Sequence, residues 1–352
     1  MRLNNKFPDP DELFARVIES YYLETQEGLF FAVKGMEHPP DRVIAVLRYA
    51  PDPEPGGRVK GGKSYRRLYR FAEQERLMRT TYPHYLAYDP VFRTTLQSVP
   101  RSLVQRIYDP RQRLQELMPA AAGKGIEGDA AAFAGLLEKE AAVPSSALGI
   151  TGSLLIGLHT ELSDLDIAVF GAESCRRAHQ GLRRLLDGQS GELRRLDARG
   201  MEALYAQRVV DTRMAFGQFV DLEERKVNQG CFRRRTYFIR FIKEAREASE
   251  MYGRFGYTPL GRTTITAVIA DDQEAIFTPC RYLVSDVRSR EGASVQNLNE
   301  IVSFRGRFCE QAQTGESVMA AGTLERVQNS RGDAWHRLLL GNSAEDTMVV
   351  WR

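Results

Sequence analysis

The stretch Thr151–Gly171, TGSLLIGLHTELSDLDIAVFG, decides the fold that we expect for this chain. The residues SALGIT at 146–151 favour a short strand that delivers Gly152 and Ser153 at its end. Gly152 permits a tight backbone turn, and Ser153 can cap the helical segment LLIGL that follows. Free backbone N–H groups at a helix start bind phosphate oxygens. The sequence therefore predicts a phosphate-binding turn at these two residues.

The second half of the stretch, DLDIAVF, alternates with a period of two. Asp164 and Asp166 point to one face of the expected strand, with their Cα atoms ~6.6 Å apart. Two carboxylates at this spacing can share Mg²⁺ or Mn²⁺ ions, which require oxygen ligands. In such a site one ion lowers the pKa of an attacking hydroxyl and the other neutralises departing pyrophosphate. The alternative, a surface strand with two exposed aspartates, leaves unexplained why a polar pair follows this turn.

A Gly-Ser turn followed by an Asp-x-Asp strand resembles the signature of the DNA polymerase β-like nucleotidyltransferase superfamily. The wider chain also resembles a poorly characterised prokaryotic group of predicted nucleotidyltransferases, through GLFFAVKGMEHPPDRVIAVLRY, IFTPCRYLV and IVSFRGRF. The resemblance implies that Gly152 and Ser153 hold the phosphates of an NTP, and that Asp164 and Asp166 bind metal. We add Ser163, which precedes Asp164, to the expected nucleotide-binding residues.

Catalytic members of this superfamily usually carry a third carboxylate on a neighbouring strand, and the sequence does not place it. The strand-like segment TYFIRFI carries Arg240 where an acid is expected. Asp271 and Asp272, which end the segment TTITAVIA, are the candidates we retain, although DDQE is also ordinary turn chemistry. Asp197 and Asp211 are weaker options. If none completes the site, the protein binds nucleotide without transferring it.

The order of expected elements predicts an α+β, multi-domain fold. An N-terminal α/β domain is expected over residues 1–100, and a nucleotidyltransferase α/β core over residues 101–256. Residues 257–352 contain short strands separated by turn-forming segments, so we expect a C-terminal antiparallel β-barrel-like domain, OB-like in character.

Composition narrows the class of protein. The 352 residues include 49 Lys and Arg against 46 Asp and Glu, so no strong overall field attracts a polyanion. The four cysteines lack the spacing of a zinc site or a disulfide framework. We find no apolar run that would span a membrane and no signal-peptide core, so a cytoplasmic location is expected. The oligomeric state is not indicated.

The stretch Gly57–Ser64, GRVKGGKS, matches the P-loop pattern G-x-x-x-x-G-K-[ST]. That pattern requires a buried strand leading directly into the loop and a helix leading out of it. Here the proline-rich segment PDPEP precedes the first glycine, and YRRLYRF after Ser64 is as compatible with a strand as with a helix. We therefore interpret the match as a mobile basic hairpin loop.

The acceptor is the least determined part of the prediction. Arginines cluster after the motif, at 176–199 and in CFRRRTYFIRF, where aromatic residues separate them. Such mixtures can hold RNA or another nucleic acid, although a solvated Arg face around buried Phe is the commoner structure. FRGRF at 304–308 has the same two interpretations. We expect an enzyme that transfers NMP from an NTP to a hydroxyl on an RNA, a protein or a small molecule. The alternative is a catalytically incomplete protein that binds nucleotide or RNA.

Overall fold

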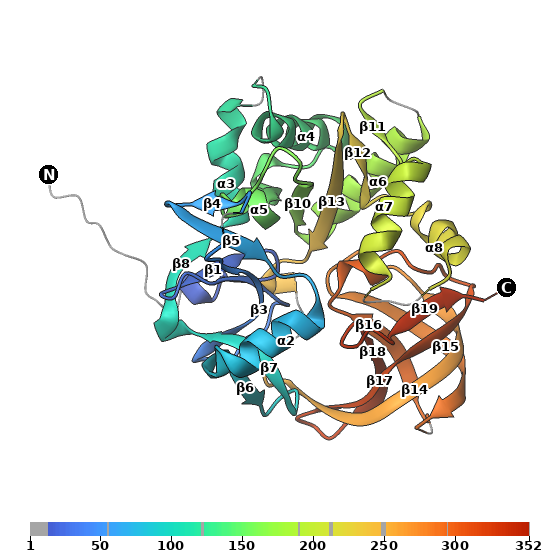
Figure 1. Cartoon of the computed structure of the whole chain (residues 1–352). Coiled ribbons are helices and arrows are strands. Elements are labelled where there is room, and N and C mark those ends of the chain that lie inside the picture. Colours follow the sequence, from blue (N-terminus) through green and yellow to red (C-terminus); the bar gives the residue numbers. More distant parts are fainter. Residues whose placement is uncertain are drawn as a thin grey trace, which may run out of the picture.

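The computed structural model describes residues 13–54, 56–120, 123–188, 191–210, 214–247, 251–293 and 295–351. It contains three β-sheets and several helices, so the expected α+β class is confirmed at this level. The sheets follow one another along the chain and form three units (Figure 1). In the view of Figure 1, the first unit lies at the left and the third unit at the right, and the middle unit lies above them.

The first unit is an eight-stranded sheet in which every pairing is antiparallel. The strand order is β4-β5-β3-β2-β1-β8, and β7 pairs with both β3 and β6. In β3 every second side chain is buried, as the alternating sequence predicts. The sheet continues past residue 100, because Val104–Tyr108 pairs with Tyr22–Thr25. Its elements are β1 (Tyr22–Thr25), β2 (Phe30–Val33), β3 (Arg42–Pro51), β4 (Val59–Lys60), β5 (Lys63–Arg67), α2 (Phe71–Thr80), η1 (Pro83–Tyr85), β6 (Leu86–Asp89), β7 (Thr94–Pro100), η2 (Arg101–Leu103) and β8 (Val104–Tyr108).

The middle unit is a five-stranded mixed sheet in the order β11-β12-β13-β10-β9. The central pair, β10 and β13, is parallel and in register from Leu165 opposite Tyr237. The other pairs are antiparallel. Its elements are α3 (Pro110–Leu117), η3 (Met118–Ala120), α4 (Ile126–Ala141), η4 (Ser145–Ala147), β9 (Leu148–Ile150), α5 (Gly152–Leu155), β10 (Leu165–Phe170), α6 (Ala172–Asp187), β11 (Leu193–Arg194), α7 (Ala198–Arg208), α8 (Phe216–Glu223), β12 (Gln229–Phe232), β13 (Arg235–Ile242) and η5 (Ala245–Glu247).

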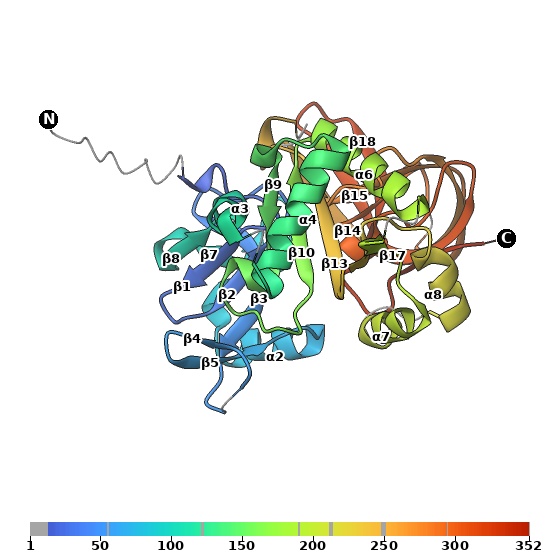
Figure 2. The same ribbon diagram turned by 90° about the horizontal axis from the view of Figure 1, so that it is seen from above.

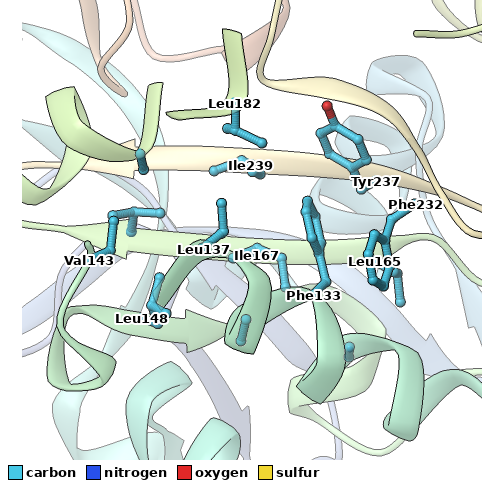
Figure 3. Packing of buried hydrophobic residues seen from close by; sticks show 14 of the residues in the cluster. Phe133, Leu137, Val143, Leu148, Leu165, Ile167, Leu182, Phe232, Tyr237 and Ile239 are labelled. Carbon is cyan, nitrogen blue, oxygen red and sulfur yellow. The ribbon is translucent and has the colours of Figure 1, made fainter. Parts of the chain in front are cut away.

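The two faces of this sheet have different partners. The odd-numbered side chains of β10 and β13, such as Ile167 and Ile239, pack with residues of α4 and α6 in one core (Figure 3). The even-numbered side chains face the other way, and Ala168, Phe170 and Ile242 join the core of the first unit. Viewed from above, α4 lies across the sheet, with the first unit and the third unit on opposite sides (Figure 2). Asp166 therefore faces away from the helices.

The third unit is a curled, barrel-like sheet. Its pairings run β14-β15-β16-β18-β17 and return to β14, while β19 pairs with β17 outside this ring. One pair, β16–β18, is parallel, so the expectation of a wholly antiparallel unit is wrong. The reason is topological: β18 folds back from β17 in a hairpin and so runs in the direction of β16. The elements are β14 (Phe255–Asp271), β15 (Cys280–Gly292), β16 (Leu298–Ser303), η6 (Gly306–Phe308), β17 (Ser317–Asn329), β18 (Ala334–Leu340) and β19 (Thr347–Val350).

Candidate active site

A large cleft lies where the three units meet. It has a volume of about 1090 Å³, and residues of all three sheets line it. Asp164 and Asp166 are in the lining, as are Lys34 and Arg48 from the first unit and Arg337 from the third. The two aspartates reach the cleft because α4 and α6 cover the odd-numbered face of β10 and leave the even-numbered face free of helices.

The two predicted aspartates have different surroundings. Asp164 immediately precedes β10, and its carboxylate accepts a hydrogen bond from the Thr236 hydroxyl on β13. The Asp166 side chain makes no hydrogen bond or ion pair with any described residue. Burial raises the pKa of Asp166, while the positive charge of Arg240 opposes that rise. An unpaired, partly buried carboxylate in a cleft is costly to the fold unless a cation binds it.

Gly152 packs directly against Asp166. The Thr151 N–H donates to the Asp166 carbonyl at 2.9 Å, which joins the turn to the strand. Gly152 has φ +65°, and a Cβ there would lie 2.8 Å from Cγ of Asp166 and closer still to its Oδ2. Only glycine therefore fits both the backbone conformation and the neighbouring carboxylate. The structure brings the two halves of the predicted motif together.

Ser153 and Ser163 are both buried, and they hold the loop between the turn and the strand. The Ser153 carbonyl accepts from the Leu158 N–H at 2.9 Å. The Ser163 hydroxyl accepts from the Thr160 N–H at 2.9 Å, and closes the turn that precedes Asp164. The helix α5 is a single turn of four residues. Its first N–H groups are adjacent to Asp166, but its dipole is small.

The predicted third carboxylates lie elsewhere. Asp271 is the last residue of β14 and Asp272 follows it, and neither lines the cleft. Asp271 accepts from the Gln273 N–H at 2.9 Å, as in an ordinary Asx turn, and Asp272 accepts from the Thr314 hydroxyl at 2.7 Å. Both carboxylates thus stabilise local turns of the third unit.

Neither of the remaining options adds a third acid within the described residues. Asp197 caps α7 by accepting from the Gly200 N–H, and Asp211 lies outside the described residues. On β13, the side chains that share the face of Asp166 are Thr236, Phe238 and Arg240. Among the described residues, no three or more His, Cys, Asp or Glu side chains form a cluster that could hold a metal. Within the described part of the chain, the candidate metal ligands are therefore Asp164 and Asp166.

Among the cations that line the cleft, Lys34 and Arg48 were not predicted, and Arg240 was grouped with the arginines of a nucleic-acid surface. Lys34 follows β2 and donates to the Glu19 carboxylate at 2.6 Å. The pKa of Lys34 is lowered to about 8, mainly by burial and also by the charges of Arg240 and Arg48, while Glu19 opposes the shift. The Arg240 guanidinium lies 3.8 Å from Glu19. Lys34 and Arg240 therefore share the Glu19 carboxylate.

Arg48 is the most exceptional of the three. It lies on β3 and lines the cleft, with its guanidinium 5.8 Å from the ring centre of Tyr69. It forms no ion pair with any described carboxylate. Burial lowers the pKa of Arg48, and the positive charges of Arg240 and Arg67 contribute to the shift. A guanidinium in such surroundings normally has an anionic partner.

Other arginines that the sequence assigned to a phosphate backbone are already paired with acids. Arg233 and Arg235 both bind Asp129, at 3.0 and 2.8 Å, and Arg235 also binds Glu161 at 2.8 Å. Arg235 thereby fixes the loop before Asp164. The helix α6 covers the opposite face of the sheet from Asp166, so its arginines do not surround the site. The aromatic residues Phe232, Tyr237 and Phe241 are buried in the core.

The segment FRGRF at 304–308 is not a strand. β16 ends at Ser303, and Gly306–Phe308 is a 3-10 turn. Phe308 is buried in the core of the third unit, whereas Phe304 lines the cleft. The two phenylalanines therefore do not form one stacking face.

The P-loop match is a β-hairpin. Val59 pairs with Ser64 and Lys60 with Lys63, so neither a buried strand nor a following helix frames the loop. The interpretation as a hairpin is confirmed, and two of its basic side chains bond to a neighbouring segment. Lys60 donates to the Ile156 carbonyl at 2.5 Å, and Arg58 donates to the Leu158 carbonyl. These bonds attach the hairpin to the chain that follows α5.

Comparison with known proteins adds one relative. The chain is similar to an uncharacterized protein of Methanocaldococcus jannaschii, with 26% identity over 331 residues that cover 92% of this chain and 95% of that protein. No family model matches the chain. No solved structure matches it either. In the part of the chain that the structure describes, none of the helices combines the length and apolar character needed to cross a bilayer.

Proposed function

We propose that this chain is a metal-dependent nucleotidyltransferase that moves a nucleoside monophosphate from an NTP to a hydroxyl acceptor. The observation that carries the proposal is the position of Asp164 and Asp166 at the cleft, with Asp166 unpaired against the Gly152 turn. The resemblance of this motif to the polymerase β-like superfamily supports the same reaction.

The two carboxylates fit a Mg²⁺ ion, because this metal is commonly held by one or two carboxylates together with substrate phosphates. Asp164 and Asp166 would hold it. When bound, Mg²⁺ would lower the pKa of the acceptor hydroxyl and neutralise charge on the departing pyrophosphate. Thr236 would fix the orientation of Asp164, since its hydroxyl donates to that carboxylate. Gly152 would leave the space that the Asp166 carboxylate occupies.

In the proposed reaction the acceptor oxygen attacks the α-phosphorus of the NTP. The new O–P bond forms as the bond from the α-phosphorus to the bridging oxygen breaks, and its electron pair leaves with pyrophosphate. The proton of the acceptor hydroxyl passes to solvent. The turn at Gly152 and Ser153, which adjoins Asp166, would contribute backbone N–H groups to the phosphates.

We propose that the third unit is OB-like and that its side of the cleft binds the acceptor. Arg281, Arg305 and Phe304 line the cleft there. Arginine beside an aromatic ring favours a nucleic-acid strand as acceptor. Arg281 is paired with Glu300, so its charge is partly neutralised. The four cysteines are free and buried, which agrees with the cytoplasmic location that we propose.

A second candidate function is nucleotide or RNA binding without transfer. The observation that favours it is the face of β13 beside Asp166, which carries Thr236, Phe238 and Arg240 and no acidic side chain. A protein of this kind would bind NTP and release no pyrophosphate with any acceptor.

The test is transfer of label from α-³²P NTPs in the presence of Mg²⁺. Separate reactions would contain total RNA, total protein or a small-molecule extract, which identifies the class of acceptor. The proposal expects label in one class, and loss of that label in the folded Asp164→Ala, Asp166→Ala double variant. Transfer that survives in the double variant would refute the site. Binding of NTP without transfer to any class would favour the second candidate.

A further inference from the structure

The first unit brings positive charge to the cleft in an arrangement that its own carboxylates do not balance. Lys34 and Arg240 share Glu19, and Arg48 has no acidic partner among the described residues. Arg48 and Asp166 both line the cleft, yet they form no ion pair with each other. An unpaired cation and an unpaired carboxylate thus face the same space.

Such an arrangement is unfavourable in the empty protein. Arg48 and Arg240 repel each other, and both repel Lys34, at a site where burial already disfavours charge. A fold tolerates this cost where a ligand supplies the missing opposite charge. The missing charge is negative on the side of the first unit and positive on the side of Asp164 and Asp166.

The geometry points to a metal–triphosphate, and we propose that Lys34, Arg48 and Arg240 bind the phosphates of the NTP. The inference rests on the proposed function and adds the residues that hold the leaving group. A bare anion fits poorly, because Asp164 and Asp166 repel it. An anion that carries a divalent cation satisfies both sides of the cleft at once. Guanidinium groups suit phosphate oxygens because they donate in pairs.

One consequence is that neither sheet alone contains the site. The middle unit supplies Asp164, Asp166 and Arg240, whereas Lys34 and Arg48 belong to the first unit. Ala168, Phe170 and Ile242 pack into the core of the first unit, and this packing fixes the position of the first unit relative to β10 and β13. The first unit would thus form one half of the nucleotide site.

The test is calorimetric binding of two probes, Mg²⁺–tripolyphosphate and Mg²⁺–ATP, to the full chain. Arg48→Gln and Arg240→Gln are compared with Arg79→Gln, which also removes a cation from the cleft lining. Arg79 is the matched control because it is exposed and already paired with Glu75 at 2.8 Å. We expect each of the first two variants to weaken both probes by about 10- to 100-fold, as for a lost charge-assisted hydrogen bond. Arg79→Gln should change either affinity by less than about threefold.

Three outcomes would overturn the inference: no binding of either probe to the wild-type chain, unchanged affinity in both Arg48→Gln and Arg240→Gln, or equal losses in the control. Unchanged affinity with intact transfer would leave the nucleotidyltransferase proposal standing. Arg48-dependent binding of tripolyphosphate with no transfer would support the phosphate site and refute the transfer reaction. Circular dichroism of each variant separates these outcomes from misfolding.

Discussion

The contact between Gly152 and Asp166 gives the sharpest prediction about the site. Gly152→Ala adds a methyl group at φ +65°, 2.8 Å from Cγ of Asp166. Gly157→Ala is a matched control, because Gly157 has φ +68° and its added Cβ would meet only Nζ of Lys60, at 3.8 Å. The two variants share the backbone strain and differ in the clash with the carboxylate.

The expected magnitudes follow from these contacts. An alanine in the left-handed region costs roughly 1–2 kcal/mol, and we expect Gly157→Ala to lose about this much stability. Gly152→Ala should lose about 1–3 kcal/mol more, which is the usual cost of overpacking. Because Asp166 must move aside, transfer should fall by about 100-fold, as it does when a catalytic group shifts by an ångström. Gly157→Ala should leave the rate of transfer close to that of the wild-type chain.

Urea unfolding followed by far-UV circular dichroism measures the stability difference in the wild-type and Asp166→Ala backgrounds. With the carboxylate gone, most of the additional loss caused by Gly152→Ala should vanish, and only the Cβ contact at 3.0 Å remains. If the two glycine variants are equal in stability and in transfer, Gly152 does not position Asp166. If the additional loss persists without the carboxylate, the clash has another cause.

Three further predictions concern the rest of the structure. Lys60→Ala removes the bond to the Ile156 carbonyl and should cost about 1–3 kcal/mol of stability. Lys63→Ala should change neither the melting temperature nor the affinity for NTP. A loss of NTP affinity in Lys63→Ala would restore the P-loop interpretation. Asp166→Asn should leave the melting temperature unchanged or raise it, because it removes a buried, unpaired charge; a clear drop would mean that the carboxylate has a structural partner. Burial lowers the pKa of His38 from 6.5 to about 4, so the unfolded chain binds more protons in this range and stability falls as the pH falls. His38→Gln should remove up to about 1.4 kcal/mol per pH unit from that slope, and the same slope in both proteins would contradict the assignment.

Local patterns predicted the part of the fold in which the determinants are local. The period-two alternation predicted that Asp164 and Asp166 share one face. Gly152 and Asp166, which are in contact, are only fourteen positions apart in the sequence. The hairpin at Gly57–Ser64 followed from the proline and glycine context. In each case neighbours in sequence decide the structure.

The phosphate-binding cations could not be found in this way. Lys34 follows the apolar strand β2 and Arg48 lies within β3, and an isolated basic residue in such a context is only a weak signal. They reach the cleft because the first sheet packs on the even-numbered face of β10, a relation that spans more than one hundred residues. Conversely, the sequence indicated that Arg233 and Arg235 could bind phosphate, but in the fold both form ion pairs with Asp129. Charge balance in a site depends on tertiary contacts that spacing does not reveal.

The most direct measurement of the central claim is the position of Mn²⁺, located by anomalous scattering in crystals grown with a non-hydrolysable NTP analogue. We expect a Mn²⁺ peak within coordination distance of both Asp164 and Asp166, with the triphosphate extending toward Arg48 and Arg240. A nucleotide bound at the Gly57–Ser64 hairpin, or a metal bound away from these two carboxylates, would contradict it.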